Sequence, residues 1–144
     1  MPIQQGATNA FKLGLTNGTF DFNTDTFKIA LYTGTANIGA DTAAYIATGE
    51  VPNGSGYTTG GENLTVSVAP TFGSVPSNTT LYLSFDNVTW NPASFTARGA
   101  LIYKDGGGNP TVCVLDFGGD KTATTTFTVQ FPAANSTNAI IRIA

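Results

Sequence analysis

The second half of the chain is a succession of short β-branched and aromatic runs separated by turn residues, and this spacing constrains the fold most. In one run, Phe127-Thr-Val-Gln-Phe131, apolar and polar residues alternate with the period of a half-buried strand. Many short strands at such spacing are typical of antiparallel sandwiches and barrels. The sequence therefore predicts an all-β fold, a jelly-roll-like antiparallel β-sandwich. Including one clear strand in the first half, the expected strands are Phe27–Thr33, Leu64–Ala69, Thr80–Phe85, Val88–Trp90, Phe95–Tyr103, Thr111–Phe117, Thr125–Phe131 and Ala139–Ile143.

The N-terminal segment 1–18 has a different pattern. Apolar residues recur at helical spacing within Ala7–Thr16, and Asn17-Gly18 follows as a C-terminal stop signal. One short helix is expected there, although Gly14 weakens it. An extended N-terminal arm is the alternative. A chain of 144 residues is long enough for one core, so we expect a single domain, 1–144.

Between the first two expected strands lies a long loop, Gly34–Glu62, dense in Gly, Thr and Asn. One helical turn over Asp41–Ile46, capped by Asp41, is the only regular structure expected in it. Structureless loops of this length are uncommon in compact domains and are often functional. Two further connections are expected at glycine-rich turns, Asp105–Asn109 and Phe117–Lys121.

The apolar phase of each expected strand identifies the core. Side chains on that phase are expected to point between the two sheets of the sandwich. The expected core residues are Phe27, Ile29, Leu31, Trp90, Leu101, Val112, Val114, Phe127, Val129, Phe131, Ile141 and Ile143. Cys113, the one cysteine, lies in an apolar run and is expected to be a buried, inert thiol.

The composition is poor in the groups that perform chemistry. The chain has no histidine, six basic and nine acidic residues, and no second cysteine. The usual general base and a common metal ligand are therefore missing. The basic residues are scattered rather than clustered, which disfavours nucleic-acid binding. We expect no catalytic residues, no cofactor, no metal and no small-molecule substrate.

Two acidic patterns resemble functional motifs, one a calcium-binding loop and the other a pair of catalytic carboxylates. Asp21-Phe-Asn-Thr-Asp25 copies the first five positions of a calcium loop, but Thr26 replaces the required glycine and Tyr32 the bidentate glutamate. An ordinary turn, in which these side chains bond nearby backbone, is favoured. The pair Asp116 and Asp120 flanks Gly-Gly, and an edge ion pair of Asp116 with Lys121 or Arg98 is favoured over catalysis.

The long loop supplies the best candidates for contact residues, namely Tyr45, Ile46 and Tyr57. Because the loop has few apolar anchors, contacts from outside the domain could offset the cost of ordering it. Exposed aromatic rings could also stack on sugars, which makes Tyr45, Tyr57, Trp90 and Tyr103 candidates for glycan binding. For Trp90, burial in the core is favoured over an exposed position.

Nearly the whole chain, from about Phe11 onward, resembles small virion structural proteins of tailed bacteriophages. The residues that carry the resemblance are Asp25–Thr33, Ala43–Tyr45, Gly49–Val51, Gly54–Tyr57, Gly60-Gly61, Trp90, Thr96–Tyr103, Val114–Gly118, Phe127–Pro132 and Ala139–Ile143.

The resemblance implies a non-enzymatic part of a virion, made in the host cytoplasm and acting by binding its neighbours. The favoured function is a capsid decoration, or cement, protein that binds the major capsid protein and copies of itself. The alternative is a tail-associated module that binds a receptor or a glycan. The sequence lacks an export signal and an apolar run of about 20 residues, so we expect no membrane association.

Overall fold

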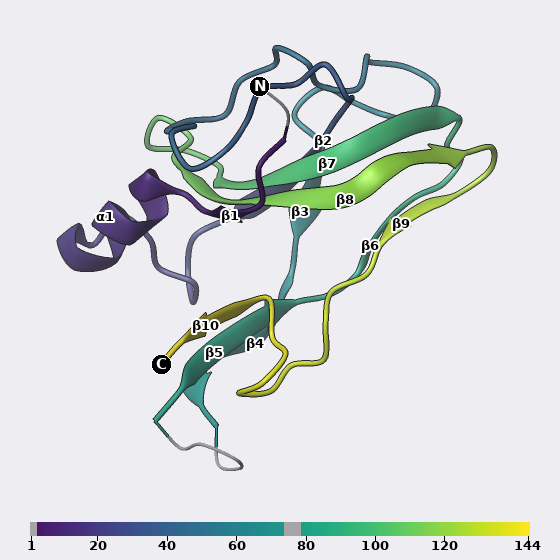
Figure 1. Ribbon diagram of the computed structural model, residues 1–144. Helices are drawn as coiled ribbons and strands as arrows, with labels where there is room; N and C mark the ends of the chain where they lie inside the picture. The colour runs from purple at the N-terminus through teal and green to yellow at the C-terminus, as the bar shows by residue number, and fades with distance from the viewer. Residues whose placement is uncertain (1–2, 74–78) are drawn as a thin grey trace.

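The structure is a computed structural model that describes residues 3–73 and 79–144. Its largest element is a five-stranded sheet in the order β1-β8-β7-β2-β3, in which every neighbouring pair is antiparallel. A three-stranded antiparallel sheet, β10-β5-β4, and a two-stranded ribbon, β6-β9, lie on one side of it (Figure 1). The prediction of an all-β, sandwich-like fold with one short N-terminal helix is confirmed.

The elements follow the chain in a simple order. They are β1 (Gly6–Ala7), α1 (Asn9–Asn17), β2 (Phe27–Tyr32), β3 (Glu62–Leu64), β4 (Val66–Phe72), β5 (Leu81–Phe85), β6 (Val88–Trp90), β7 (Phe95–Lys104), β8 (Thr111–Ala123), β9 (Phe127–Val129) and β10 (Ile141–Ile143).

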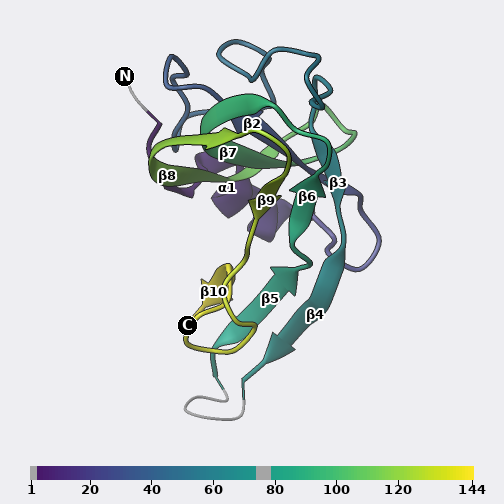
Figure 2. The same cartoon turned by 90° about the vertical axis from the view of Figure 1, so that its right-hand side faces the viewer.

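The five-stranded sheet is covered on both faces. One face, here called the strand face, carries Phe27, Ile29 and Ile102 and packs against α1, β5, β6, β9 and β10 in the main core. The other, here called the loop face, carries Tyr32 and Leu101 and is covered by loop residues from the N-terminal half. Figure 2 shows the resulting order of loops, sheet and smaller sheets. Alternation along β2 explains the division, because successive side chains of a strand point to opposite faces.

Helix α1 ends at the predicted stop signal but begins at Asn9 rather than Ala7, because Gly6 and Ala7 pair with β8 as strand β1. The Thr8 hydroxyl accepts a hydrogen bond from the Phe11 amide at its start, and Gly18 closes it in the left-handed conformation. Gly14 is needed because Phe20 lies against the helix: a Cβ at Gly14 would come within 2.3 Å of the Phe20 ring. The residue that weakens the local helical signal is therefore the one that allows the helix to pack.

Two local predictions are wrong. The helical turn over Asp41–Ile46 does not form, because this backbone pairs instead with the β7–β8 hairpin: Thr111 N donates to Ala43 O, and Tyr45 N donates to Asn109 O. Phe117–Lys121 is not a connection between strands. Strand β8 continues through it to Ala123, with a register shift against β7 that accommodates the glycines as a bulge. The other predicted turn, Asp105–Asn109, does connect β7 to β8.

The predicted core is buried with two exceptions. Phe131 is half-buried against the main core, and Ile143, the last residue of β10, is 40% exposed. A bulge between Ile102 and Tyr103 also separates two valines expected together: Val112 lies on the strand face and Val114 on the loop face. Cys113 is buried as predicted, and burial raises the pKa of its thiol to about 12.

None of the helices in residues 3–73 and 79–144 has the length and hydropathy needed to cross a membrane.

Candidate interaction surface

Residues 34–61 are here called the loop layer: Ala36, Ile38 and Tyr45 cover the loop face of the five-stranded sheet, whereas Val51 and Tyr57 pack into the main core (Figure 1). Ile38 packs into the cluster on that face and is almost fully buried. Two backbone bonds attach the layer to the edge of β2, from Thr33 N to Gly49 O and from Val51 N to Leu31 O, each 2.9 Å long. The few apolar anchors expected in the loop layer are thus supplemented by backbone hydrogen bonds within the chain itself.

A buried carboxylate holds the middle of the loop layer together. The Tyr57 hydroxyl donates to Glu50 Oε1 at 2.6 Å, the Tyr45 hydroxyl donates to Glu50 Oε2 at 2.6 Å, and the Gly60 amide donates to Glu50 Oε1 at 2.7 Å. We call these four residues the Glu50 clasp. Three donors offset much of the cost of removing the Glu50 charge from water.

Hydrogen bonds at three tyrosine hydroxyls, those of Tyr57, Tyr103 and Tyr32, connect the clasp and the loop backbone beside it to the five-stranded sheet. The Leu31 amide donates to the Tyr57 hydroxyl at 2.9 Å, so this hydroxyl joins β2 to the clasp. The Tyr103 hydroxyl on β7 donates to Gly60 O at 2.6 Å, and the Tyr32 hydroxyl on β2 donates to Ile46 O at 2.7 Å. The clasp therefore fixes the loop layer to the two central strands.

The same surroundings keep these tyrosines protonated. Burial, and then the hydrogen bond to Glu50, raises the pKa of Tyr57 well above its ordinary value, and the same two causes act on Tyr45. Burial and the nearby Glu50 charge raise the pKa of Tyr103 to about 12. The hydroxyls act as hydrogen-bond donors, and their raised pKa values make them poor candidates for general bases near neutral pH.

The three residues expected to make external contacts lie in different environments. Tyr57 is only 2% exposed and belongs to the main core, so its assignment as a surface contact residue is wrong. Tyr45 is half-buried, with its ring stacked on Tyr103 at a centroid distance of 4.8 Å. Ile46 is 39% exposed, so one apolar side chain of the expected set is available on the surface.

The candidates for stacking on sugars are also occupied inside the fold. Trp90 and Tyr103 are buried, and Tyr57 lies between the rings of Trp90 and Phe95. Tyr45 has one face against Tyr103 and its hydroxyl bound to Glu50. The residues proposed for glycan binding therefore have structural roles, and the preference for Trp90 as a core residue is confirmed.

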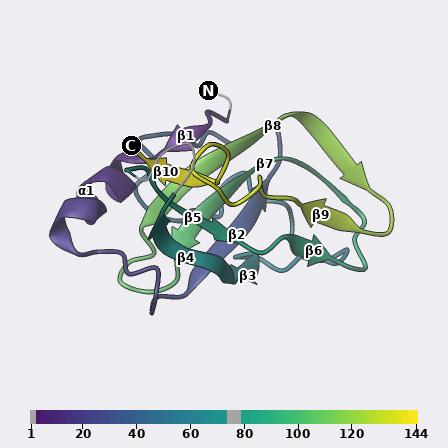
Figure 3. The same cartoon turned by 90° about the horizontal axis from the view of Figure 1, so that it is seen from below.

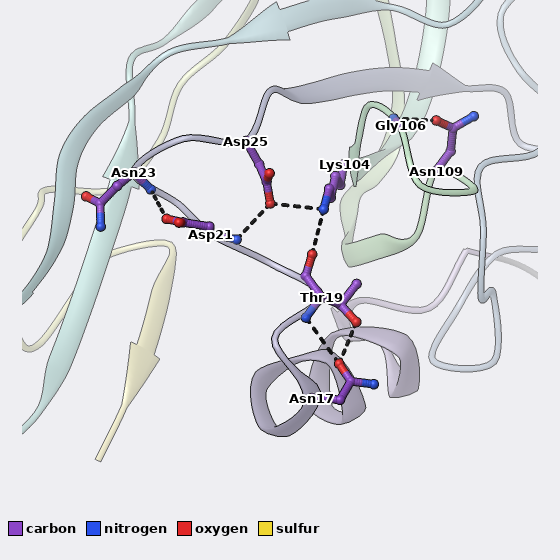
Figure 4. Close-up of polar contacts among 8 residues, drawn as sticks. All are labelled: Asn17, Thr19, Asp21, Asn23, Asp25, Lys104, Gly106 and Asn109. Atoms are coloured by element: carbon purple, nitrogen blue, oxygen red, sulfur yellow. Dashed lines mark hydrogen bonds and ion pairs between the residues drawn. The ribbon is translucent and has the colours of Figure 1, made fainter.

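The calcium-like segment is an ordinary turn closed by a lysine (Figure 4). Asp21 Oδ1 accepts from the Asn23 amide, a bond that holds the pKa of Asp21 below its usual value, and Asp25 Oδ2 accepts from the Asp21 amide. Lys104 Nζ lies 3.1 Å from Asp25 Oδ2 and donates to Thr19 O at 2.7 Å. The cation at this place is thus an ammonium group, which ties the segment to the end of β7.

The second acidic pattern gives a weak surface contact. Asp120, rather than Asp116, pairs with Arg98, at 3.6 Å with both side chains largely exposed. Asp116 Oδ1 accepts from the Gly118 amide inside the bulge. Across the part of the chain that the structure describes, no three acidic or cysteine side chains are grouped as metal ligands would be.

The Glu50 clasp was missed because its parts have no sequence spacing of their own. Glu50 stands without a nearby acidic residue in a Gly- and Thr-rich loop, and its partners lie 5, 7 and 10 residues away on irregular backbone. The one available signal is the occurrence of two tyrosines in a loop whose other residues are mostly small and polar.

Comparisons of the chain with protein families, with curated proteins and with solved structures find no match.

Proposed function

We propose that the chain is a non-enzymatic structural protein of a tailed-bacteriophage virion, and that it decorates the capsid by binding the major capsid protein and copies of itself. The loop layer carries the proposal. Its only charged residues are Asp41 and Glu50, and Glu50 is buried in the clasp. The surface that the loop layer offers is therefore nearly neutral and is held in place by the clasp before any partner arrives.

Such a surface suits repeated protein contacts. Little charge has to be desolvated when it meets a neighbour, and a clasped loop loses little conformational entropy on binding. A capsid lattice offers many equivalent sites, so modest contacts summed over many copies stabilise the particle. Ile46 directly follows Tyr45 of the clasp, and its carbonyl accepts a hydrogen bond from Tyr32. This exposed apolar residue is the one that we place at the centre of the contact.

Copy number in particles of the phage that encodes the chain tests the proposal. Quantitative mass spectrometry of purified particles is expected to find hundreds of copies, in proportion to the major capsid protein. About a dozen copies or fewer would place the chain in the tail instead. A chain absent from purified particles would overturn a virion function altogether.

Hydrogen exchange tests the contact surface. The amides of Val51 and Tyr57 already donate to Leu31 O and Gly54 O, so we expect them to be protected in the isolated chain. Additional protection in the particle is expected at Ile46 and Ala47, which follow the exposed end of the clasp. Equal exchange at these two amides in both states would show that the loop layer is not the contact surface.

A further inference from the structure

The three-stranded sheet extends beyond the core that it covers. Leu83 and Phe85 of β5 lie in the main core, and Leu81 lies two residues before Leu83 on the same side of the strand. Leu81 is paired with Phe72 of β4 on one side and with Ile143 of β10 on the other. Directly opposed residues of antiparallel strands share a face, so Phe72, Leu81 and Ile143 form one row, here called the distal row.

The distal row continues the core face, and no other layer formed by residues 3–73 and 79–144 covers its outer ends. Phe72 is 61% exposed and Ile143 is 40% exposed, whereas Ile141, one step nearer the core on the same face of β10, is buried. Figure 2 shows β4 and β5 descending away from the five-stranded sheet, which explains why the inner residues are covered and the distal ones are not. Phe72 and Ile143 are thus left facing water at the end of the sheet, with the half-buried Leu81 between them.

The distal row is free of charge. Strands β4 and β5 contain no charged residue, and Arg142 of β10 is paired with Tyr82 and so points to the opposite face. A nucleic acid or a charged peptide would find no counter-charge on this face. A partner that fits it must present an uncharged apolar surface, and the distal row of a second copy is such a surface.

We propose that two copies of the chain associate by packing their distal rows face to face around a two-fold axis. Each row then supplies the layer that the other lacks, at the spacing of about 10 Å that stacked sheets adopt. Continuation of the sheet through its β4 edge is disfavoured, because Pro70 removes a backbone donor and the two register shifts against β5 distort the strand. The inference does not depend on a function in the virion.

The contact area sets the expected strength. A fully buried aromatic side chain removes about 150–250 Å² from water, so Phe72, 61% exposed, contributes roughly 90–150 Å². Stable protein interfaces bury about 800 Å² on each partner. The distal row alone supplies much less, so we expect a weak dimer that forms only as the protein concentration approaches about 1 mM. In a crowded assembly with many copies side by side, this affinity is sufficient.

Sedimentation equilibrium and amide NMR on the full chain test the proposal. Between about 50 μM and 1 mM, the weight-average mass is expected to rise from that of a monomer toward that of a dimer. The amide signals of Phe72, Leu81 and Ile143 are expected to shift with concentration. Phe72→Ser is expected to raise the dissociation constant at least tenfold, because each dimer loses two phenyl groups.

Leu13→Ser is the matched control. Leu13 is 64% exposed on α1, so the change removes comparable apolar area from another surface, and circular dichroism checks that both variants remain folded. The proposal is overturned if the wild-type chain stays monomeric at 1 mM. It is also overturned if Leu13→Ser weakens association as much as Phe72→Ser, or if the concentration-dependent shifts lie in the loop layer instead.

Discussion

The two faces of the five-stranded sheet are buried by different means. On the strand face, β-strands and α1 bring aromatic rings together, as in the stacked pair Phe22 and Phe27 with centroids 4.5 Å apart. On the loop face, irregular backbone is held by a carboxylate and by tyrosine hydroxyls that reach it from the loop and from the sheet. Figure 3 shows the strand-face elements, with the small sheets nearest the viewer.

Each face of the sheet is sensitive to a different kind of substitution. Apolar contacts on the strand face are many and non-directional, so loss of one large side chain leaves a cavity with a predictable cost. The loop face depends on a few directional bonds to Glu50, so loss of one group leaves several buried donors without an acceptor. We therefore expect global destabilisation from changes on the strand face and local opening from changes on the loop face.

The largest effect is expected on the strand face. Phe127 packs against Trp90, Phe95 and Phe117, so Phe127→Ala should destabilise the chain by about 3–5 kcal/mol, seen as a lower urea midpoint and poor solubility. Thr128→Ala, with an exposed side chain that shares a hydrogen bond with Thr89, should cost less than about 1 kcal/mol. Equal midpoints for the two variants would contradict the assigned phase of β9.

The second-largest destabilisation is expected from a substitution of Gly61, the last residue of the loop layer. Gly61 has φ +81°, and a Cβ there would lie 1.8 Å from Ile29 O, so Gly61→Ala should cost about 2–4 kcal/mol through strain and displacement of the backbone. Gly107→Ala is the matched control, since its φ is +63° and no atom lies near its Cβ position. It should cost about 1 kcal/mol. Similar urea midpoints would mean that the close approach to β2 is unimportant.

Removal of the clasp carboxylate is expected to have a comparable but more local effect. Glu50→Ala leaves the Tyr45 hydroxyl and the Gly60 amide without their acceptor, at a cost of about 2–3 kcal/mol. Amide exchange should accelerate within residues 44–61 and stay unchanged in β9. Glu62→Ala, which removes an exposed carboxylate at the start of β3, serves as the control. Faster exchange on both faces after Glu50→Ala would show that the two faces are not independent.

Near neutral pH the smallest effect is that of tyrosine ionisation, which changes stability only under alkaline conditions. Tyr57 and Tyr103 keep their protons in the folded state above pH 10, whereas in the unfolded state they ionise near pH 10. Their stabilisation is therefore complete below pH 10 and declines as the pH rises from 10 toward 12, by up to about 1.4 kcal/mol per pH unit for each group. Urea unfolding at several pH values should show this slope, and Tyr57→Phe should reduce it. If the unfolding free energy of Tyr57→Phe depends on pH as steeply as that of the wild type, Tyr57 does not cause the dependence.

The structural predictions are correct mainly where the sequence has a clear periodicity or a local stop signal. Alternation in Phe27–Tyr32 identifies a strand and the phase that enters the main core, but not the burial of Ala30 and Tyr32 on the other face. The stop signal at Asn17-Gly18 identifies the end of α1. The predictions failed where backbone partners are remote. Asp41–Ile46 looks like a capped helical turn, but its amides and carbonyls pair with residues near Pro110, about seventy positions away along the chain.

For the candidate interaction surface, too, some residues are predicted correctly and others are not. The sequence identifies the long loop as the unusual segment and Ile46 as one of its exposed apolar residues, but it places Tyr57 on the surface, whereas the structure buries it against Glu50. A tyrosine in a polar loop has no local signal for burial, because its hydroxyl becomes satisfied only when a remote acceptor is present.

By itself the sequence determined the class of fold, the positions of most strands and the shortage of catalytic groups, because these depend on composition and on local periodicity. The tertiary structure alone decided that the loop layer closes over its own sheet, that a lysine neutralises the calcium-like turn, and that Phe72 and Ile143 meet on one row. The physical reason is that burial of a polar group, and the joining of apolar residues into one surface, depend on strand register and on partners far apart in the chain.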